Sequence, residues 1–272
     1  MKKRRLIIAI AMLLSVMTAA MAQCKFQNTA FKSGEHLTYN LYFNWKFVWV
    51  KVGSASMSTV ENHYNGKPAY RASLITRTSS KADKFFIMRD TLLCYTTTQL
   101  EPLYFRKGAQ EGKRYTVDEA FYSYPSADKV HIRQHRLRHN GENVYREWTR
   151  AECTYDMLSI FLRARSFNPE SWKKGTRVNF PITDGTHITP ALIEYKGKTT
   201  IKADNGVKYR CLQLSYMEQD GKKYKELVRF YVTDDSNHVP VRLDMFLKFG
   251  SAKAFLVGAK GVRGQMTSIV NK

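Results

Sequence analysis

The stretch LTYNLYFNWKFVW, residues 37–49, determines how the rest of the chain is read. Its apolar and aromatic residues occupy every second position, and polar residues stand at positions 38, 40, 44 and 46. A period of two is typical of a strand that is buried on one side, and aromatic side chains suit such a surface. A membrane helix would not carry polar residues at such regular intervals. The stretch therefore predicts a strand whose buried face holds Leu37, Tyr39, Leu41 and Phe43.

The alternation changes phase near the end of this stretch, where the apolar residues become Val48, Val50 and Val52. A shift of one residue moves every following side chain to the opposite face of a strand. We therefore expect a β-bulge or a tight turn between Trp45 and Val50.

Asn-Gly and Asp-Gly dipeptides interrupt the rest of the chain at Asn65-Gly66, Asn140-Gly141, Asp184-Gly185, Asn205-Gly206 and Asp220-Gly221. Such dipeptides adopt the positive φ angles of tight hairpin turns. The runs that we expect to be strands are 69–78, 85–96, 115–122, 130–137, 144–148, 177–182, 187–195, 208–217, 224–232, 239–248 and 254–262. The pattern predicts an all-β fold with a strongly curved antiparallel sheet, open or closed into a barrel-like form.

One segment departs from this pattern. In CTYDMLSIFLRARSFNP, residues 153–169, the apolar residues follow helical spacing, and Thr154 is a candidate N-cap. Arg163 and Arg165 fall in the last turn, where positive charge suits the helix dipole. We predict one central α-helix at about 155–166 that packs on the curved sheet or plugs it.

The first 22 residues have the pattern of a secretory signal peptide: four basic residues, a short apolar run and the ending Ala20-Met21-Ala22. The apolar run is shorter than the roughly 20 residues that a membrane span needs. Gln23 rather than a small residue precedes Cys24, which argues against a lipid anchor. We expect cleavage after Ala22, a single β-rich domain at 23–272 without a transmembrane helix, and export, to the periplasm of a Gram-negative envelope or beyond it.

The chain is strongly basic, with a formal net charge of +21. Residues 1–22 hold four of the 44 Lys and Arg and none of the 23 Asp and Glu, so the chain that follows them carries +17. Such an excess favours anionic partners, namely lipid headgroups or acidic glycans of the envelope. Export excludes nucleic acid as the expected partner, and a solvated basic surface without a single partner is the alternative.

Four cysteines are widely spaced: Cys24, Cys94, Cys153 and Cys211. In an oxidising compartment they allow up to two disulfides in any of three connectivities. Cys94 and Cys211 lie within predicted strands and are equally compatible with buried free thiols. The spacing matches no zinc site, and no cofactor motif is present.

Several short motifs resemble the bacterial exported proteins grouped as domain of unknown function 3108. They are Phe31-x-x-Gly34-Glu35-x-Leu37-x-Tyr39 followed by Gly53-x-Ala55, the segments 155–159 and 162–165, and the segments 230–234 and 239–241. The resemblance covers nearly all of the chain after the leader. It implies an exported, mainly β fold, and it brings no catalytic residues.

Three histidines, His131, His135 and His139, recur at intervals of four residues. On a helix this spacing would line one face and suit a metal, but Val130 and Ile132 favour a strand, on which four residues span about 13 Å. We therefore predict an exposed basic strand without a metal. The adjacent Arg133, Arg136 and Arg138 are candidates for an anion-facing strip.

No nucleophile elbow and no cysteine–histidine signature appears, and we read Glu35 and Asp90 as surface groups or partners of arginine rather than as an acid pair. The sequence holds 16 Tyr, 15 Phe and 4 Trp. A curved sheet lined with such residues can enclose an apolar ligand, although a filled core without a cavity is equally compatible. Trp45 and Trp49 are the first candidates for ligand contact.

The sequence as a whole predicts a non-catalytic envelope protein that binds a lipid or another amphiphilic anion, with the apolar part inside and a basic rim outside. A glycan-acting hydrolase of the envelope is the first alternative. The second is a scaffold that binds another envelope protein through an exposed strand edge.

Overall fold

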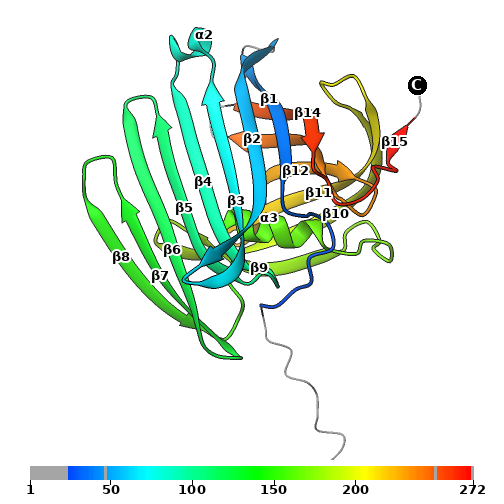
Figure 1. The fold of residues 1–272 in the computed structure, drawn as a ribbon. Helices are drawn as coiled ribbons and strands as arrows, with labels where there is room; N and C mark the ends of the chain where they lie inside the picture. Colours follow the sequence, from blue (N-terminus) through cyan, green and yellow to red (C-terminus); the bar gives the residue numbers. More distant parts are fainter. Residues whose placement is uncertain (1–23, 46–47, 248–249, 271–272) are drawn as a thin grey trace, which may run out of the picture.

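A computed structural model describes residues 24–45, 48–247 and 250–270. The elements in these ranges (Figure 1) are β1 (Glu35–Trp45), β2 (Val48–Tyr64), β3 (Lys67–Thr78), α2 (Ser80–Asp83), β4 (Met88–Thr97), β5 (Pro102–Glu111), β6 (Arg114–Ser126), β7 (Lys129–Leu137), β8 (Asn143–Arg150), α3 (Met157–Arg165), β9 (Arg177–Asp184), β10 (His187–Lys202), β11 (Lys208–Asp220), β12 (Lys223–Thr233), β13 (Pro240–Leu247), β14 (Gly250–Lys260) and β15 (Ile269–Val270). The helices in this part of the chain, α2 and α3, both fall short of the length that a bilayer-spanning helix requires.

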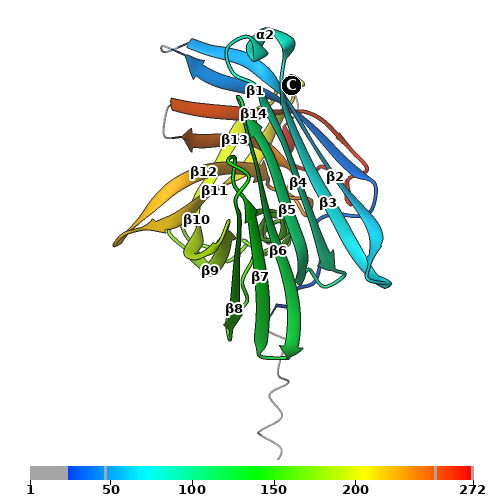
Figure 2. The same ribbon diagram turned by 90° about the vertical axis from the view of Figure 1, so that its left-hand side faces the viewer.

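The strands form one antiparallel sheet in the order β8-β7-β6-β5-β4-β3-β2-β1-β14-β13-β12-β11-β10-β9, and β15 pairs with β11. Two runs of successive hairpins, β1 to β8 and β9 to β14, are joined where β1 pairs with β14. Figures 1 and 2 show that the sheet curves strongly, so that the two runs face each other across its concave side. The predicted all-β fold with a strongly curved antiparallel sheet is confirmed.

The first hairpin explains the alternation of residues 37–49. Leu37, Tyr39 and Leu41 are buried on the concave side of the sheet, which we call the inner face. Phe43 lies on the same face of β1 but is half-buried, because β1 approaches the end of the sheet there. Trp45 pairs with Val48, so the chain reverses between them, and the predicted change of phase is this reversal. A bulge in the same pair of strands lies further along, between Leu41 and Tyr42.

The five predicted turn dipeptides all connect antiparallel neighbours. At the link from β2 to β3, Asn65 and Gly66 adopt φ angles of 51° and 76°, the left-handed conformations that this turn requires. Two predictions were wrong at the level of single segments. β5 was not among the predicted strands, because Pro102 and the polar run from Arg106 to Gln110 hide its alternation. The run 85–96 was placed too early, since β4 begins at Met88 and α2 precedes it.

The predicted central helix is confirmed as α3, but its N-cap is Asp156 rather than Thr154. Oδ1 of Asp156 accepts hydrogen bonds from the backbone N–H groups of Leu158 (3.0 Å) and Ser159 (2.9 Å). The Ser159 hydroxyl accepts the N–H of Asp156 in return, which completes a capping box. Thr154 lies too early, because residues 153–155 run alongside β9 through a bridge between Tyr155 and Ile182.

Helix α3 occupies the space inside the curve (Figure 1). Leu158 and Leu162 pack into a main core that includes Leu37, Tyr122 and Leu256. The side of the helix that carries Ile160 packs into a second core, formed mainly by residues of β9 to β12. The helix therefore plugs the sheet, as its apolar composition predicted.

The two outermost strands, β8 and β9, are not paired with each other in the described part of the chain. Side chains of β6 and β7 instead reach the β9–β10 hairpin. Gln134 donates hydrogen bonds to the carbonyl oxygens of Gly185 (2.9 Å) and His187 (3.1 Å), and Tyr122 lies 3.3 Å from the Thr183 hydroxyl. The sheet is thus held in a barrel-like curve by side chains rather than by a closing ladder of backbone hydrogen bonds.

Candidate functional site

Part of the inner face is covered only incompletely. Side chains from β2, β3, β4, β13 and α3 pack against the main core and remain partly exposed; they are Val52, Leu74, Met88, Leu243, Met245 and Phe161. Phe43 and Val50, which face each other across the β1–β2 pair, extend this region toward the hairpin turns. The inner face thus carries an apolar region that is open to solvent.

Six exposed large apolar side chains lie at the adjoining end of the sheet. We call this set the apolar end; it comprises Val48, Trp49, Phe85, Phe86, Phe246 and Leu247. It comes from the β1–β2 hairpin, the segment after α2 and the β13–β14 hairpin. Because β1 pairs with both β2 and β14, the two hairpins turn side by side. Figures 1 and 2 place α2 at the same end.

Two aromatic rings of the apolar end lie against cations. Nζ of Lys253 is 4.0 Å from the centroid of the Trp49 ring, and Cζ of Arg229 is 5.5 Å from that of Phe246. Partial burial lowers the pKa of Lys253, and the nearby charge of Arg242 lowers it further. Both contacts are within the range of cation–π attraction. Aromatic and cationic groups therefore occupy one surface here.

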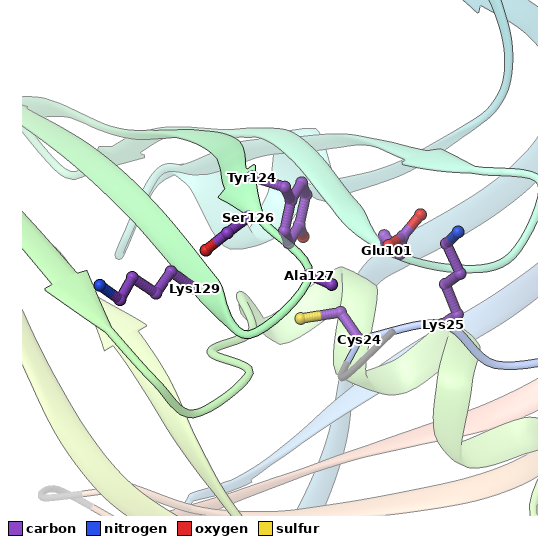
Figure 3. Close-up of a pocket in the computed structure, with 7 residues that line it drawn as sticks. All are labelled: Cys24, Lys25, Glu101, Tyr124, Ser126, Ala127 and Lys129. Carbon is purple, nitrogen blue, oxygen red and sulfur yellow. The ribbon is translucent and has the colours of Figure 1, made fainter. Parts of the chain in front are cut away.

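Two small pockets flank the disulfide between Cys24 and Cys153. The pocket of about 260 Å³ is lined by Cys24, Lys25, Glu101, Tyr124, Ser126, Ala127 and Lys129 (Figure 3). The second, of about 180 Å³, is lined by Glu152, Cys153, Tyr155, Ile160, Arg163, Phe167, Val178, Asn179 and Phe180. Both are smaller than the roughly 300–1,000 Å³ of typical ligand cavities. Tyr124 lines the first pocket, and Tyr155, Phe167 and Phe180 line the second, so only a few of the aromatic residues line these two pockets.

The disulfide itself selects one of the three connectivities that the sequence left open. Cys24 pairs with Cys153, while Cys94 and Cys211 are buried free thiols. Burial raises the pKa of the Cys94 thiol well above its usual value and that of Cys211 to about 12. The disulfide points to an oxidising compartment outside the cytoplasm.

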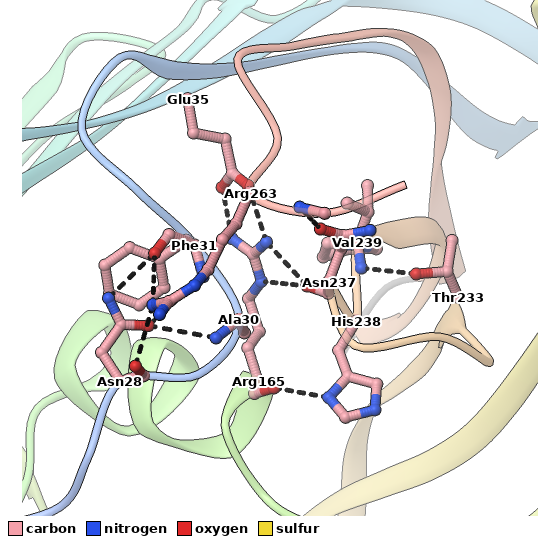
Figure 4. Close-up of polar contacts among 12 residues, drawn as sticks. Asn28, Ala30, Phe31, Glu35, Arg165, Thr233, Asn237, His238, Val239 and Arg263 are labelled. Carbon is pink, nitrogen blue, oxygen red and sulfur yellow. Dashed lines mark hydrogen bonds and ion pairs between the residues drawn. The ribbon is translucent and has the colours of Figure 1, made fainter. Parts of the chain in front are cut away.

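A polar cluster joins the segments that carry the sequence motifs. Arg165, at the end of α3, pairs with Glu35 at the start of β1 and donates to the carbonyl oxygen of Asn237 at 2.9 Å (Figure 4). Nδ1 of His238 lies 2.5 Å from the carbonyl oxygen of Arg165. Arg263 donates to the carbonyl oxygen of Asn28 at 3.0 Å. Glu35, Arg165 and Asn237 are buried and pair with one another, which indicates a structural role, whereas Arg263 is exposed.

The structure separates the predicted ligand-contact residues. Trp49 lies on β2 and Arg133 on β7, five strands apart in the sheet order, which corresponds to about 24 Å. The side chain of Trp45 lies outside the described part of the structure. Arg133 and Arg136 are three residues apart on one strand and so point to opposite faces. Trp49, Arg133 and Arg136 therefore do not lie side by side on one face of the sheet.

The three arginines also have partners of their own. Arg133 lies over the Phe121 ring at 5.4 Å. Arg136 donates from Nε and Nη2 to the carboxylate of Asp118 at 2.5 and 2.9 Å. Arg138, in the turn after β7, pairs with Glu142 at 2.8 Å. Two of the three charges are thus balanced by neighbouring carboxylates.

His131 and His135 lie on β7, as the strand prediction requires, and His139 follows it. Nδ1 of His135 lies 2.9 Å from Glu119, and this hydrogen bond raises the pKa of His135. Nδ1 of His131 lies 3.1 Å from the Thr149 hydroxyl. In the described ranges no three His, Cys, Asp or Glu side chains are grouped closely enough to hold a metal ion.

The two carboxylates considered as an acid pair have different surroundings. Glu35 forms an ion pair with Arg165, which agrees with the expectation of an arginine partner. Asp90 lies on β4, where burial raises its pKa to about 6 despite the nearby charge of Lys107. Its Oδ1 is buried and accepts no hydrogen bond within the described residues.

Sequence reasoning missed most of the apolar end. Phe85 and Phe86 were assigned to a strand, and Phe246 and Leu247 were read as the end of another. The sequence did carry a signal: pairs of large apolar residues stand beside predicted turns. Turns are usually exposed and polar, so such pairs indicate an exposed apolar surface.

Comparisons with known proteins agree with this architecture. Residues 38–257 match the family model described as Protein of unknown function (DUF3108). A crystal structure of a β-barrel-like protein of domain of unknown function DUF1849 from Brucella abortus has the same fold: its TM-score is 0.52 at 9% identity, covering 85% of this chain and 98% of that one. No curated protein matches the chain. On the match over residues 38–257, this chain belongs to the DUF3108 family.

Proposed function

We propose that the chain is an exported, non-catalytic protein of the bacterial envelope that binds a lipid or another amphiphilic anion. One observation carries the proposal: the partly exposed apolar region of the inner face continues into the exposed side chains of the apolar end. Large exposed apolar surfaces mark sites of interaction. The disulfide and the basic leader support a place outside the cytoplasm, with residues 1–22 removed, a single domain at 23–272 and the periplasm as the compartment.

The apolar part of the ligand packs, in this proposal, against Val50, Leu74 and Met245 rather than inside a closed cavity. Its anionic part lies near the cations at the rim of the same end, among them exposed Lys51. This arrangement keeps the two components of affinity that the sequence suggested, an apolar one and an electrostatic one. The ligand lies in a different place from the one that the sequence suggested, because α3 fills the interior of the curved sheet.

Titration with short- and long-chain lysophosphatidylglycerol, each kept below its micelle concentration, tests the proposal. Affinity should rise with chain length, by about 0.8 kcal/mol for each methylene that is buried. Raised salt should weaken only the headgroup contribution, because it screens exposed charges. Val50→Ser together with Met245→Ser should remove the dependence on chain length. Equal binding of both chain lengths by the wild-type protein would reject the apolar contact.

A second candidate is a scaffold that binds a partner protein along β8. This strand ends the sheet, and most of its residues are exposed, including Tyr145. An unpaired edge offers backbone groups to another strand. Loss of partner binding on Val144→Pro, without loss of lysolipid binding, would favour this candidate. A glycan hydrolase would need two carboxylates facing one open site, and Glu35 is instead enclosed with Arg165.

A further inference from the structure

The apolar end exposes more large apolar side chains to solvent than the binding of a single ligand molecule requires. Its six side chains are between 37% and 87% exposed, and Phe85 is the most exposed of them. Single exposed apolar residues are ordinary, but a contiguous group of them marks an interaction surface. Here six of the exposed large apolar side chains lie at one end of the sheet.

The three contributing segments are held together by backbone contacts. Phe43 of β1 faces Val50 of β2 and Ala252 of β14, which places the two hairpins side by side. The segment that leads into α2 is fixed to β2 by the hydrogen bond from Ser79 N to Val52 O, at 2.8 Å. The three segments are therefore gathered at one end of the same sheet.

The charges around this surface favour an anionic partner. Lys51, Lys81 and Lys84 are exposed, and Lys253 lies over the Trp49 ring. The acidic residue of α2, Asp83, is neutralised by its ion pair with Arg89. Lysines attract anionic headgroups with about 1 kcal/mol each near a bilayer surface, while aromatic side chains occupy the headgroup level. Both components are present on one surface here.

We propose that the apolar end docks on the surface of a bilayer that contains anionic lipid. The aromatic and aliphatic side chains enter the boundary between headgroups and acyl chains, and the lysines contact the headgroups. This inference deepens the proposed function and rests on it: docking at this end would turn the open apolar region of the inner face toward the source of its amphiphilic ligand.

Cosedimentation of the chain without its leader tests the proposal with two kinds of vesicle, phosphatidylcholine alone and phosphatidylcholine mixed with phosphatidylglycerol. We expect binding to the mixed vesicles that is at least about tenfold tighter and that weakens as salt rises. Phe85→Ser with Phe86→Ser should weaken binding to the mixed vesicles at least about tenfold, because both side chains leave the interface. Both are well exposed, so their replacement should leave the fold intact.

Matched control variants test whether vesicle binding depends on where the replaced side chains lie, and not only on their apolar or charged character. Tyr145→Ser with Ile269→Ser removes two exposed apolar side chains elsewhere and should leave vesicle binding unchanged. Lys81→Gln with Lys84→Gln should weaken binding by about thirtyfold and reduce its salt dependence. Lys67→Gln with Lys129→Gln, at the opposite end of the strands, should do neither.

Three outcomes would overturn the docking proposal. The first is equal binding of the Phe85→Ser/Phe86→Ser variant and the wild-type protein. The second is equal affinity for neutral and anionic vesicles. The third is self-association in sedimentation velocity that this variant abolishes, with no vesicle binding, which would assign the surface to a second copy. Monomeric lysolipid binding without vesicle binding rejects the docking alone, whereas vesicle binding without lysolipid binding rejects the proposed function.

Discussion

Arg165 and Glu35 form a two-point ion pair in the interior of the protein. Nη1 of Arg165 lies 2.5 Å from Oε1 of Glu35 and Nη2 lies 2.8 Å from Oε2, and both side chains are 1% exposed (Figure 4). The pair links the end of α3 to the start of β1 across 130 positions of sequence. It therefore fixes the plugging helix to the strand at which the two halves of the sheet join.

Breaking this pair from one side should be costly. Arg165→Met leaves a buried carboxylate without its counter-charge, and we expect a loss of about 3–5 kcal/mol in the free energy of unfolding. Glu35→Leu combined with Arg165→Met should recover a large part of that loss, because no lone charge remains. Urea denaturation followed by circular dichroism measures both. Arg138→Gln, which breaks an exposed pair, should cost less than about 1 kcal/mol; a comparable loss there would contradict the argument.

The disulfide should contribute strongly to stability, because it closes a loop across 129 positions. Cys24→Ser with Cys153→Ser should lower the free energy of unfolding by about 2–5 kcal/mol. The measurement is denaturant unfolding of the oxidised protein and of the double variant.

The two free thiols should be inert in the folded protein. Cys94 and Cys211 are buried and their pKa values are raised, so the reactive thiolate is scarce. A colourimetric thiol reagent should detect no thiol under native conditions and two after unfolding in guanidinium. Rapid native labelling would show that these positions open to solvent.

Asp90 should make stability depend on pH. Burial raises its pKa from 3.8 to about 6, so the folded protein retains a proton that the unfolded chain releases. The free energy of unfolding therefore falls as pH rises through the interval between these two pKa values. Asp90→Asn should remove this component, which is on the order of 1–3 kcal/mol. Asp220→Asn, at the exposed end of β11, should leave the pH profile unchanged; identical profiles for Asp90→Asn and the wild-type protein would refute the assignment.

The leader should be removed at a defined position when the chain is exported. Expression with its own leader in a Gram-negative host should yield protein that begins at Gln23, because cleavage follows Ala22. Intact mass and N-terminal peptide mapping of a periplasmic extract measure this, with allowance for cyclisation of the terminal Gln. Protein that retains residues 1–22 would contradict the leader assignment.

Local features determined much of the fold. The alternation in Leu37–Leu41 placed a half-buried strand, and the dipeptides Asn65-Gly66 and Asp220-Gly221 placed hairpin turns, because strand faces and turn conformations depend on neighbouring residues. Helix α3 was visible for the same reason. Its N-cap was not, since Asp156 and Thr154 both suit that position and the bridge from Tyr155 to β9 decides between them.

The remaining features required contacts between distant residues. Nothing local to Cys24 selects Cys153 over Cys94, and nothing local to Glu35 selects Arg165. The pairing of Leu41 with Ala254 joins the two halves of the sheet, and it brings the β13–β14 hairpin beside the β1–β2 hairpin. Only this strand order gathers Trp49, Phe85 and Phe246 at one end, while it separates Trp49 from Arg133. Sequence determines which side chains a strand presents on each face; the order of strands in the sheet decides which of those side chains meet.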